Sequence, residues 1–145
     1  MPRLLPGTAV RVRRGRRHDL GAVQALLAAP AGDRLARVFR RILADLGTDL
    51  YVAEDERGEI VGLVSVLYAR SLARGGRSAL LDGARARGPA LLAELVAFAE
   101  ERARKRGCRR LAAWVDAGDR ELRAALLARG YHAGELLVTE LAGAS

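Results

Sequence analysis

The sequence predicts a mixed α+β domain, in which a central, mostly antiparallel sheet contains one parallel β-α-β unit and is flanked by helices. Two β-rich runs, 50–54 and 60–68, lie on either side of a polar turn with a glycine, which is typical of an antiparallel hairpin. Farther along, a helical pattern separates two more β-rich runs, and strands joined through a helix are expected to be parallel. The chain has 145 residues, of which 50% are hydrophobic and 29% charged, so we expect one core and a single domain over 1–145.

The first part of the chain changes from the period of a strand to the period of a helix. Valines alternate with arginines over 8–13, which predicts a half-buried strand. Asp19 precedes apolar residues at helical spacing, and a short polar side chain in this place is typical of a helix N-cap. We expect this helix to end before Pro30, because proline cannot continue a helix.

The segment 33–46 has the most regular helical pattern in the sequence. Its apolar residues recur every three or four positions, at Leu35, Val38, Phe39, Ile42, Leu43 and Leu46. Gly47 follows and is expected to be the C-terminal cap of the helix. The apolar stripe is wide enough to exceed what one sheet face covers, which leaves room for a homodimer.

The middle of the chain predicts the β-α-β unit. The run 78–82 is expected to be a short strand, and 83–89 a loop that contains arginine and glycine. A helix is predicted over 91–106, because basic residues near its end complement the negative end of the helix dipole and Gly107 follows as a cap.

The last third predicts a strand, a helix and a final strand. The run 108–115 is expected to be a strand that buries Cys108, the only cysteine, which excludes an internal disulfide and a zinc site made of cysteines. A helix capped by Asp116 or Asp119 follows. The run 131–141 is predicted to be the last strand.

The charge of the chain raises the question of a polyanionic partner. The net charge is +8 and the pI is about 11.0, a balance that is common in nucleic-acid-binding proteins. However, the basic residues are spread through every segment, and the densest cluster, 11–17, has no aromatic residues to stack on bases. We therefore interpret this cluster as a solvated strand edge and rank nucleic-acid binding last. No apolar run approaches the roughly 20 residues of a membrane span, and no signal peptide is recognised, so we expect a cytoplasmic protein.

The predicted topology places a ligand site at the loop 83–89. This loop follows the carboxyl end of a strand and precedes the N-terminus of a helix, where several backbone N–H groups have no partner within the helix. Anionic groups such as phosphates are expected to bind there.

Segments along nearly the whole chain carry a family resemblance. They are 10–20, 51–54, 60–66, 107–111 and 126–131. They resemble the GNAT superfamily of acyl-CoA N-acyltransferases. The range 10–20 resembles its first strand and turn, and 51–54 and 60–66 resemble its second and third strands. The range 107–111 resembles the step from its cofactor-binding helix to the next strand, and 126–131 resembles its closing Gly-aromatic step. The resemblance implies the GNAT fold, acetyl-CoA as cosubstrate, and transfer of an acetyl group to a primary amine of a small molecule or protein.

The phosphate-binding pattern of this family, Arg/Gln-x-x-Gly-x-Gly/Ala, has two registers here. The register 85–90 satisfies it, whereas counting back from the end of the helix gives 87–92, with alanine and leucine where glycines are expected. The residues that the resemblance implies for coenzyme A are Arg85, Arg87, Gly88, Ala90, Leu91 and Leu92. The strand near Leu80 and Leu81 would pair with pantetheine and polarise the thioester carbonyl. The alternative for the two arginines is a surface role beside a helix that Pro89 begins.

Acyl transfer to an amine needs a neutral amine, donors for the oxyanion and a proton for the leaving thiolate. Asp82 is the first candidate for the base and Glu54 the second, and the alternative for each is a satisfied turn carboxylate. The family pattern would place a tyrosine acid at Leu126, so the sequence offers Tyr131 or Tyr68 instead, or water. No histidine has a second ligand at metal spacing, so no metal site is predicted.

Two other functions remain open at this point. A non-catalytic GNAT-like binding or regulatory domain would explain both the irregular phosphate motif and the missing tyrosine. An interaction domain for nucleic acid would bind through scattered arginines and lose affinity steeply as salt rises.

Overall fold

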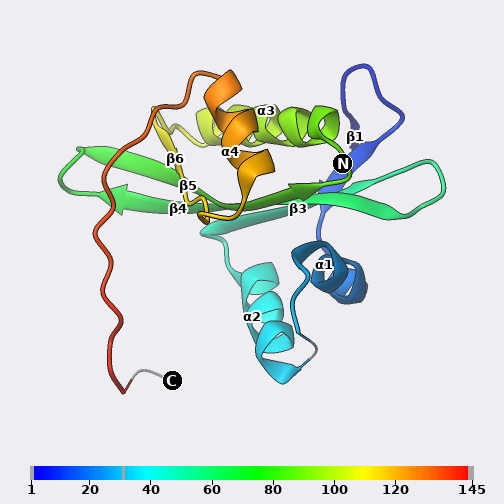
Figure 1. The fold of residues 1–145 in the computed structure, drawn as a ribbon, viewed down its shortest axis with the longest axis horizontal. Helices are drawn as coiled ribbons and strands as arrows, with labels where there is room; N and C mark the ends of the chain where they lie inside the picture. The colour runs from blue at the N-terminus through cyan, green and yellow to red at the C-terminus, as the bar shows by residue number, and fades with distance from the viewer. Residues whose placement is uncertain (1, 31, 144–145) are drawn as a thin grey trace.

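A computed structural model describes residues 2–30 and 32–143 (Figure 1). The strands are β1 (Arg3–Leu4), β2 (Arg11–Arg14), β3 (Thr48–Glu54), β4 (Ile60–Ser71), β5 (Gly76–Ala86) and β6 (Leu111–Ala113). The helices are a 3₁₀ turn (Arg17–Asp19), α1 (Leu20–Leu27), α2 (Asp33–Ala44), α3 (Pro89–Lys105) and α4 (Arg120–Ala128).

The described strands form one sheet with the order β1-β2-β3-β4-β5-β6, in which β5 and β6 are parallel and all other neighbours are antiparallel. The predicted α+β architecture and its β-α-β unit are therefore confirmed. None of the helices in the described ranges has the length and apolar character that crossing a bilayer requires.

Helices cover both faces of the sheet, with α3 and α4 on one face and α1 and α2 on the other (Figure 1). The core therefore has two parts, one on each face of the sheet, because successive side chains along a strand point to opposite faces. Tyr51 packs in the cluster that contains the α3 residue Leu95, whereas Val52 packs in the smaller cluster with Phe39 of α2. Both sheet faces are thus buried along β3.

The segment 83–89, predicted to be a loop, is mostly strand. β5 continues to Ala86, which pairs with Gly62, and only Arg87 and Gly88 connect it to α3. The prediction was wrong because small residues give no local strand signal, while the long neighbouring strand β4 supplies their hydrogen-bond partners.

The start of β6 and the end of α2 also differ from the prediction. Cys108 is buried, as expected, but it lies between the turn that follows α3 and the strand β6, which begins only at Leu111. α2 ends with Asp45 as its C-cap instead of Gly47. The Asp45 carboxylate accepts hydrogen bonds from the Gly47 amide and the Thr48 hydroxyl, both at 2.8 Å, and so fixes the turn into β3.

The predicted final strand, 131–141, is not formed. Tyr131 is partly buried, but 132–143 has no strand partner among the described residues and all its side chains are exposed. The apolar stripe of α2 is also only partly covered, because Phe39 is buried whereas Val38 is 46% exposed.

Candidate functional site

The strand β5 changes its pairing at Asp82. The register with β4 skips Asp82, which is therefore the extra residue of a β-bulge. On its other side, β5 pairs with β6 only as far as Leu81, whose carbonyl accepts a hydrogen bond from the Trp114 amide at 3.1 Å. Over 82–86, β5 has a neighbouring strand on one side only, which is β4, and no described strand on the other side. We call 82–86 the unpaired edge. Leu80 and Leu81, whose backbone the family resemblance would place against pantetheine, pair with Ala112 and Ala113 of β6, and the stretch without a β6 partner begins at Asp82.

The unpaired edge leads directly to the N-terminus of α3. Gly88 is the N-cap, with a φ of 100° that favours glycine, and an added Cβ there would meet no heavy atom within 4 Å. The amides of Gly88, Ala90 and Leu91 have no acceptor among the described residues. By contrast, the Leu92 amide donates to the Gly88 carbonyl at 3.2 Å, and the side chain of Leu92 is buried. Three of the four positions 88–91 therefore have an amide without an acceptor, and the fourth, Pro89, has no amide hydrogen.

The two arginines of the predicted site are engaged with carboxylates. Arg85 donates from Nη1 to Oδ2 of Asp119 at 2.5 Å and so ties the unpaired edge to the N-cap of α4. The cap itself was predicted correctly, because Asp119 accepts a hydrogen bond from the Leu122 amide at 3.2 Å. Arg87 donates to Glu59 at 3.1 Å, and both side chains are exposed. An exposed pair of this kind is worth at most about 1 kcal/mol, so Arg87 is free to turn toward an anion.

The candidate bases lie far apart. Asp82 is the first residue of the unpaired edge; its side chain is exposed, and partial desolvation raises the pKa of its carboxyl. Glu54 pairs with Ile60 at the start of β4, next to the β3–β4 turn. The bulge at Asp82 lies opposite Ser65 of β4, which is five residues farther along that strand. At roughly 3.4 Å per residue, the backbone positions of the two residues are offset by about 17 Å along the strands. Glu54 also accepts a hydrogen bond from Arg13 at 2.8 Å.

The tyrosines offered as acids are held in structural contacts. The Tyr131 hydroxyl donates to Glu100 of α3 at 3.0 Å, and burial, together with that carboxylate, raises its pKa. The Tyr68 hydroxyl donates at 2.8 Å to Asp49, which is fully buried, and burial again raises the pKa. Tyr68 and Tyr131 both lie outside the unpaired edge, 82–86.

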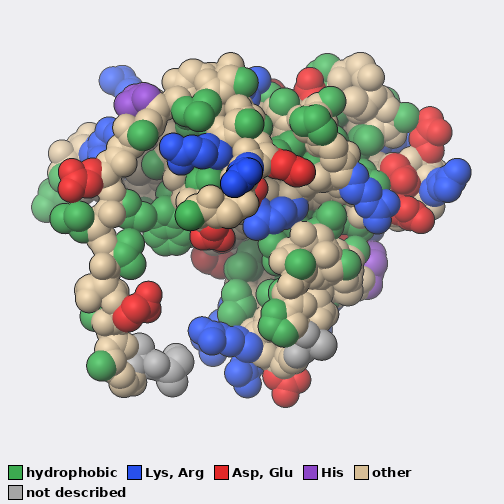
Figure 2. Space-filling view, in the orientation of Figure 1, with side chains coloured by type: hydrophobic (Ala, Val, Ile, Leu, Met, Phe, Trp, Pro, Cys, Tyr) green, Lys and Arg blue, Asp and Glu red, His purple; other side chains and the backbone are tan. Residues whose placement is uncertain are grey.

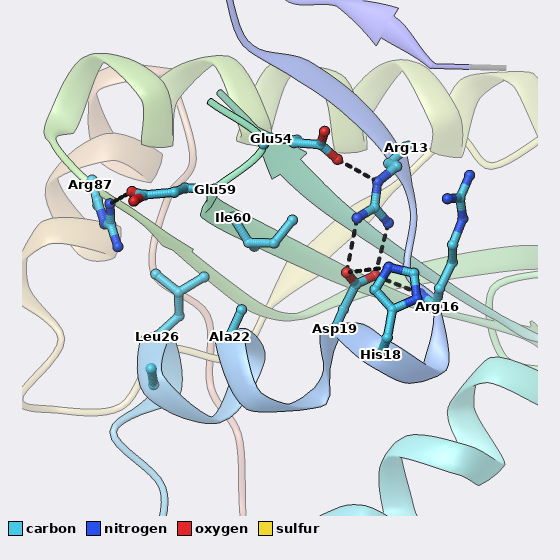
Figure 3. Close-up of a pocket in the computed structure, with 12 residues that line it drawn as sticks. Arg13, Arg16, His18, Asp19, Ala22, Leu26, Glu54, Glu59, Ile60 and Arg87 are labelled. Atoms are coloured by element: carbon cyan, nitrogen blue, oxygen red, sulfur yellow. Dashed lines mark hydrogen bonds and ion pairs between the residues drawn. The ribbon is translucent and has the colours of Figure 1, made fainter. Parts of the chain in front are cut away.

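Sequence reasoning missed a cavity of about 740 Å³ beside α1 (Figure 3). Arg13 lies between Glu54 and Asp19, and its guanidinium donates to both Asp19 oxygens at 2.8 Å. Asp19 is the N-cap residue of α1, as predicted, but its carboxylate makes no capping hydrogen bond to that helix and instead accepts from the Arg16 amide at 2.7 Å. Burial alone would raise the pKa of Asp19, yet the hydrogen bonds outweigh it and lower that pKa. Arg13 lies 41 residues from Glu54, a pairing for which the sequence has no local signal.

Arg87 connects this cavity with the N-terminus of α3. It lines the cavity wall opposite Arg13 and directly precedes Gly88, whereas Asp82 does not line the cavity (Figure 3). No group of three or more metal-ligating side chains occurs in the described ranges.

Comparison with known proteins decides the fold. No family model matches the sequence, and no curated protein matches it. A transcriptional regulator from Bacillus halodurans C-125 is similar in structure, with a TM-score of 0.80, 25% identity, and coverage of 91% of this chain and 99% of that chain. An aminoglycoside antibiotic 6'-N-acetyltransferase from Acinetobacter baumannii has a TM-score of 0.76 and 15% identity, covering 94% and 99%. An aminoglycoside N-acetyltransferase in complex with CoA has a TM-score of 0.76 and 17% identity, covering 97% and 100%.

The chain has the GNAT acyltransferase fold. The fold implied by the sequence resemblance is thereby confirmed. Within the GNAT fold, α4 carries Leu126 where the resemblance would place a tyrosine, and this leucine is 4% exposed in the core. Leu126 therefore supplies packing, and α4 brings no hydroxyl to the site at that position.

Proposed function

We propose that this protein is an N-acetyltransferase that moves an acetyl group from acetyl-CoA to a primary amine of a small molecule or a protein. One observation carries the proposal. Within the GNAT fold, the unpaired edge of β5 adjoins the N-terminus of α3, so free backbone groups for a ligand occur along one short stretch, 82–91. A protein with this fold has been solved in complex with CoA.

The residues of this stretch fit a pyrophosphate. The amides of Gly88, Ala90 and Leu91 are free to donate to phosphate oxygens, and the α3 dipole favours negative charge at this end. The first turn of α3 contains no acidic residue that would repel an anion. Arg87 would add a charge-assisted hydrogen bond once it leaves Glu59. Leu92, whose amide is already bonded, would contribute no donor.

The chemistry assigned to the chain is proton transfer and orientation. When bound, acetyl-CoA supplies an activated acetyl group as a thioester. Asp82 would accept a proton from the acceptor ammonium, because its carboxyl stands beside the unpaired edge. Glu54 is too distant from Asp82 to share that role at one reacting centre. With Leu126 in the core, water would protonate the departing thiolate.

A non-catalytic GNAT-like binding module is the second candidate. It is favoured by the contact between Arg85 and Asp119, because this contact engages the guanidinium that the first candidate assigns to coenzyme A. It is also favoured by Pro89, which removes one backbone donor from the first turn of α3. In this alternative the fold would serve a partner, and no acetyl transfer would be observed.

Calorimetric titration of the full chain with acetyl-CoA and with desulfo-coenzyme A tests the proposal. We expect stoichiometric micromolar binding, and a combined Arg85→Ala and Arg87→Ala change should weaken it about tenfold or more. The matched control is Arg70→Ala with Arg74→Ala, which removes the same charge at exposed positions near the β4–β5 turn.

The outcomes separate the two candidates. Binding followed by acetylation of an amine in an acceptor screen supports the enzyme. Binding without turnover of any amine supports the non-catalytic module. Absence of binding contradicts coenzyme A as a ligand of the protein.

A further inference from the structure

The positive charge of the chain comes from two segments, because the acidic residues are not distributed like the basic ones. The segments 60–81 and 102–115 together contain nine basic residues and no aspartate or glutamate. The rest of the chain contains 16 basic and 17 acidic residues, so it is close to neutral. The net charge of +8 therefore belongs to these two segments, although arginines occur in every part of the sequence.

The fold brings the two segments together at one end of the sheet. The β4–β5 turn and the connection from α3 to β6 line one cavity of about 680 Å³, which we call the arginine cavity. No acidic side chain of the described residues lines it, but four arginines do, namely Arg74, Arg77, Arg109 and Arg110. Figure 1 shows the β4–β5 turn at the end of the sheet opposite to the N-terminus of α3.

Carboxylates do not neutralise the arginines of this cavity. All four are exposed, and none has an ion-pair partner among the described residues. Arg70 lies directly opposite Arg77 across β4 and β5, and like charges in such a pair destabilise a sheet. At the other end of the molecule, around the β3–β4 turn, Figure 2 shows acidic and basic side chains intermingled. The arginine cavity therefore holds positive charge that the described chain does not compensate.

The residues that line the cavity also carry uncharged donors. In the described part of the chain, the amides of Arg109 and Arg110 have no acceptor, and neither has the Ser78 hydroxyl. Three glycines complete the lining, and a Cβ added to any of them would meet no heavy atom within 4 Å; they are Gly75, Gly76 and Gly107. The small residues leave room for an anion to approach the backbone closely.

The donors of the arginine cavity are those that phosphate oxygens accept. Guanidinium groups make charge-assisted, often bidentate hydrogen bonds with phosphate, and free backbone amides add to them. A single phosphate has too little charge to compensate four guanidinium groups, so several adjacent phosphates fit better. Within the described ranges no aromatic side chain lines the cavity, so it offers no stacking surface for a base. Recognition therefore depends on the phosphates of the ligand.

We propose that the arginine cavity binds a compact oligophosphate, such as inorganic triphosphate or the triphosphate group of a nucleotide. Its volume is in the range of small-molecule sites, whereas the phosphates of a nucleic-acid strand lie along an extended backbone. The site is also separate from the proposed coenzyme A site. Arg77 lies at the start of β5 and Arg87 just beyond its end, about 30 Å away along the strand.

Calorimetric titration of the full chain with inorganic triphosphate, at low salt and without divalent metal, tests the proposal. We expect one site per chain with a dissociation constant in the micromolar range, and weaker binding of inorganic monophosphate. Arg77→Gln with Arg109→Gln should raise the dissociation constant at least about tenfold, because both charge-assisted contacts are lost. The matched control is Arg37→Gln with Arg41→Gln, which removes the same charge from exposed positions of α2.

Thermal unfolding adds a second measurement. Triphosphate at one hundred times its dissociation constant should raise Tm by roughly 8 °C, because the ligand binds only the folded chain. Arg85→Ala with Arg87→Ala should keep this shift, since both arginines lie at the other end of β5.

Three results would overturn the proposal. The first is equal affinity in the Arg77–Arg109 variant and its control, or no saturable binding at millimolar triphosphate. The second is loss of binding in the Arg85–Arg87 variant, which would place the anion at the start of α3. The third is a single-stranded RNA that binds where triphosphate does not, which would indicate an extended ligand. None of these results depends on acetyl transfer, so this proposal and the proposed function can fail separately.

Discussion

Replacing Gly62 by alanine should destabilise the protein through one close contact between the sheet and α3. A Cβ at this position would lie 2.8 Å from Cδ1 of Leu95 and 3.1 Å from the carbonyl oxygen of Arg85. Leu95 is 0% exposed and the Arg85 oxygen belongs to the neighbouring strand, so neither atom has space to retreat without moving the core. Overpacking of this kind costs about 1–3 kcal/mol. At about 3 °C per kcal/mol for a chain of this length, Tm should fall by roughly 3–9 °C.

Urea unfolding followed by circular dichroism measures the change, with Gly83→Ala as the matched control. Gly83 also lies in a strand, but an added Cβ there meets nothing within 4 Å. Its replacement should leave the free energy of unfolding unchanged or raise it by up to about 1 kcal/mol, because alanine restricts the unfolded chain. If Gly62→Ala unfolds at the same urea concentration as the control, the reasoning from close packing at Gly62 is refuted.

Three carboxylates give further predictions. If Asp82 is the base, Asp82→Asn should depress turnover at neutral pH, and the acidic limb of the wild-type pH profile should lie above the usual aspartate range, since desolvation raises this pKa; normal turnover would contradict its role. Asp19 has a lowered pKa because its hydrogen bonds from Arg13 outweigh burial, so it contributes stability above about pH 4 that is lost as pH falls. Asp19→Asn should therefore show a smaller loss of unfolding free energy between pH 5 and 2, and an unchanged slope would argue against it. Asp49→Asn should cost about 2–4 kcal/mol in urea unfolding, because Arg106, bonded at 2.7 Å, would lose its buried partner; a cost near zero would show that water replaces the carboxylate.

Much of the fold could be predicted because helices and hairpins have local signals. The apolar spacing of 33–46 locates α2 within two residues, and the polar turn after Glu54 locates the β3–β4 hairpin. Pro89 and Gly107 frame α3, since proline suits the first helical position and glycine a positive φ after the end. Each of these signals acts within a few residues of the feature it predicts.

The candidate site was predictable only in part, for a related reason. The phosphate pattern points to Gly88 and Ala90, and the structure gives both a free amide at the start of α3. The bulge at Asp82 depends on the register between β4 and β5, which no local pattern encodes. The contact of Arg85 with Asp119 joins residues 34 apart, so it emerges only once α4 is placed beside β5.

The two errors about strands have one physical cause. A helix satisfies its own backbone, whereas a strand exists only where a neighbour supplies half of its hydrogen bonds. The residues 83–86 have weak strand propensity but form a strand, because β4 lies beside them. The tail has strong strand propensity but forms none, because nothing in the described chain lies beside it. The strand propensity of 132–141 is therefore not enough to form a strand, because no described strand lies beside this segment to supply its hydrogen bonds.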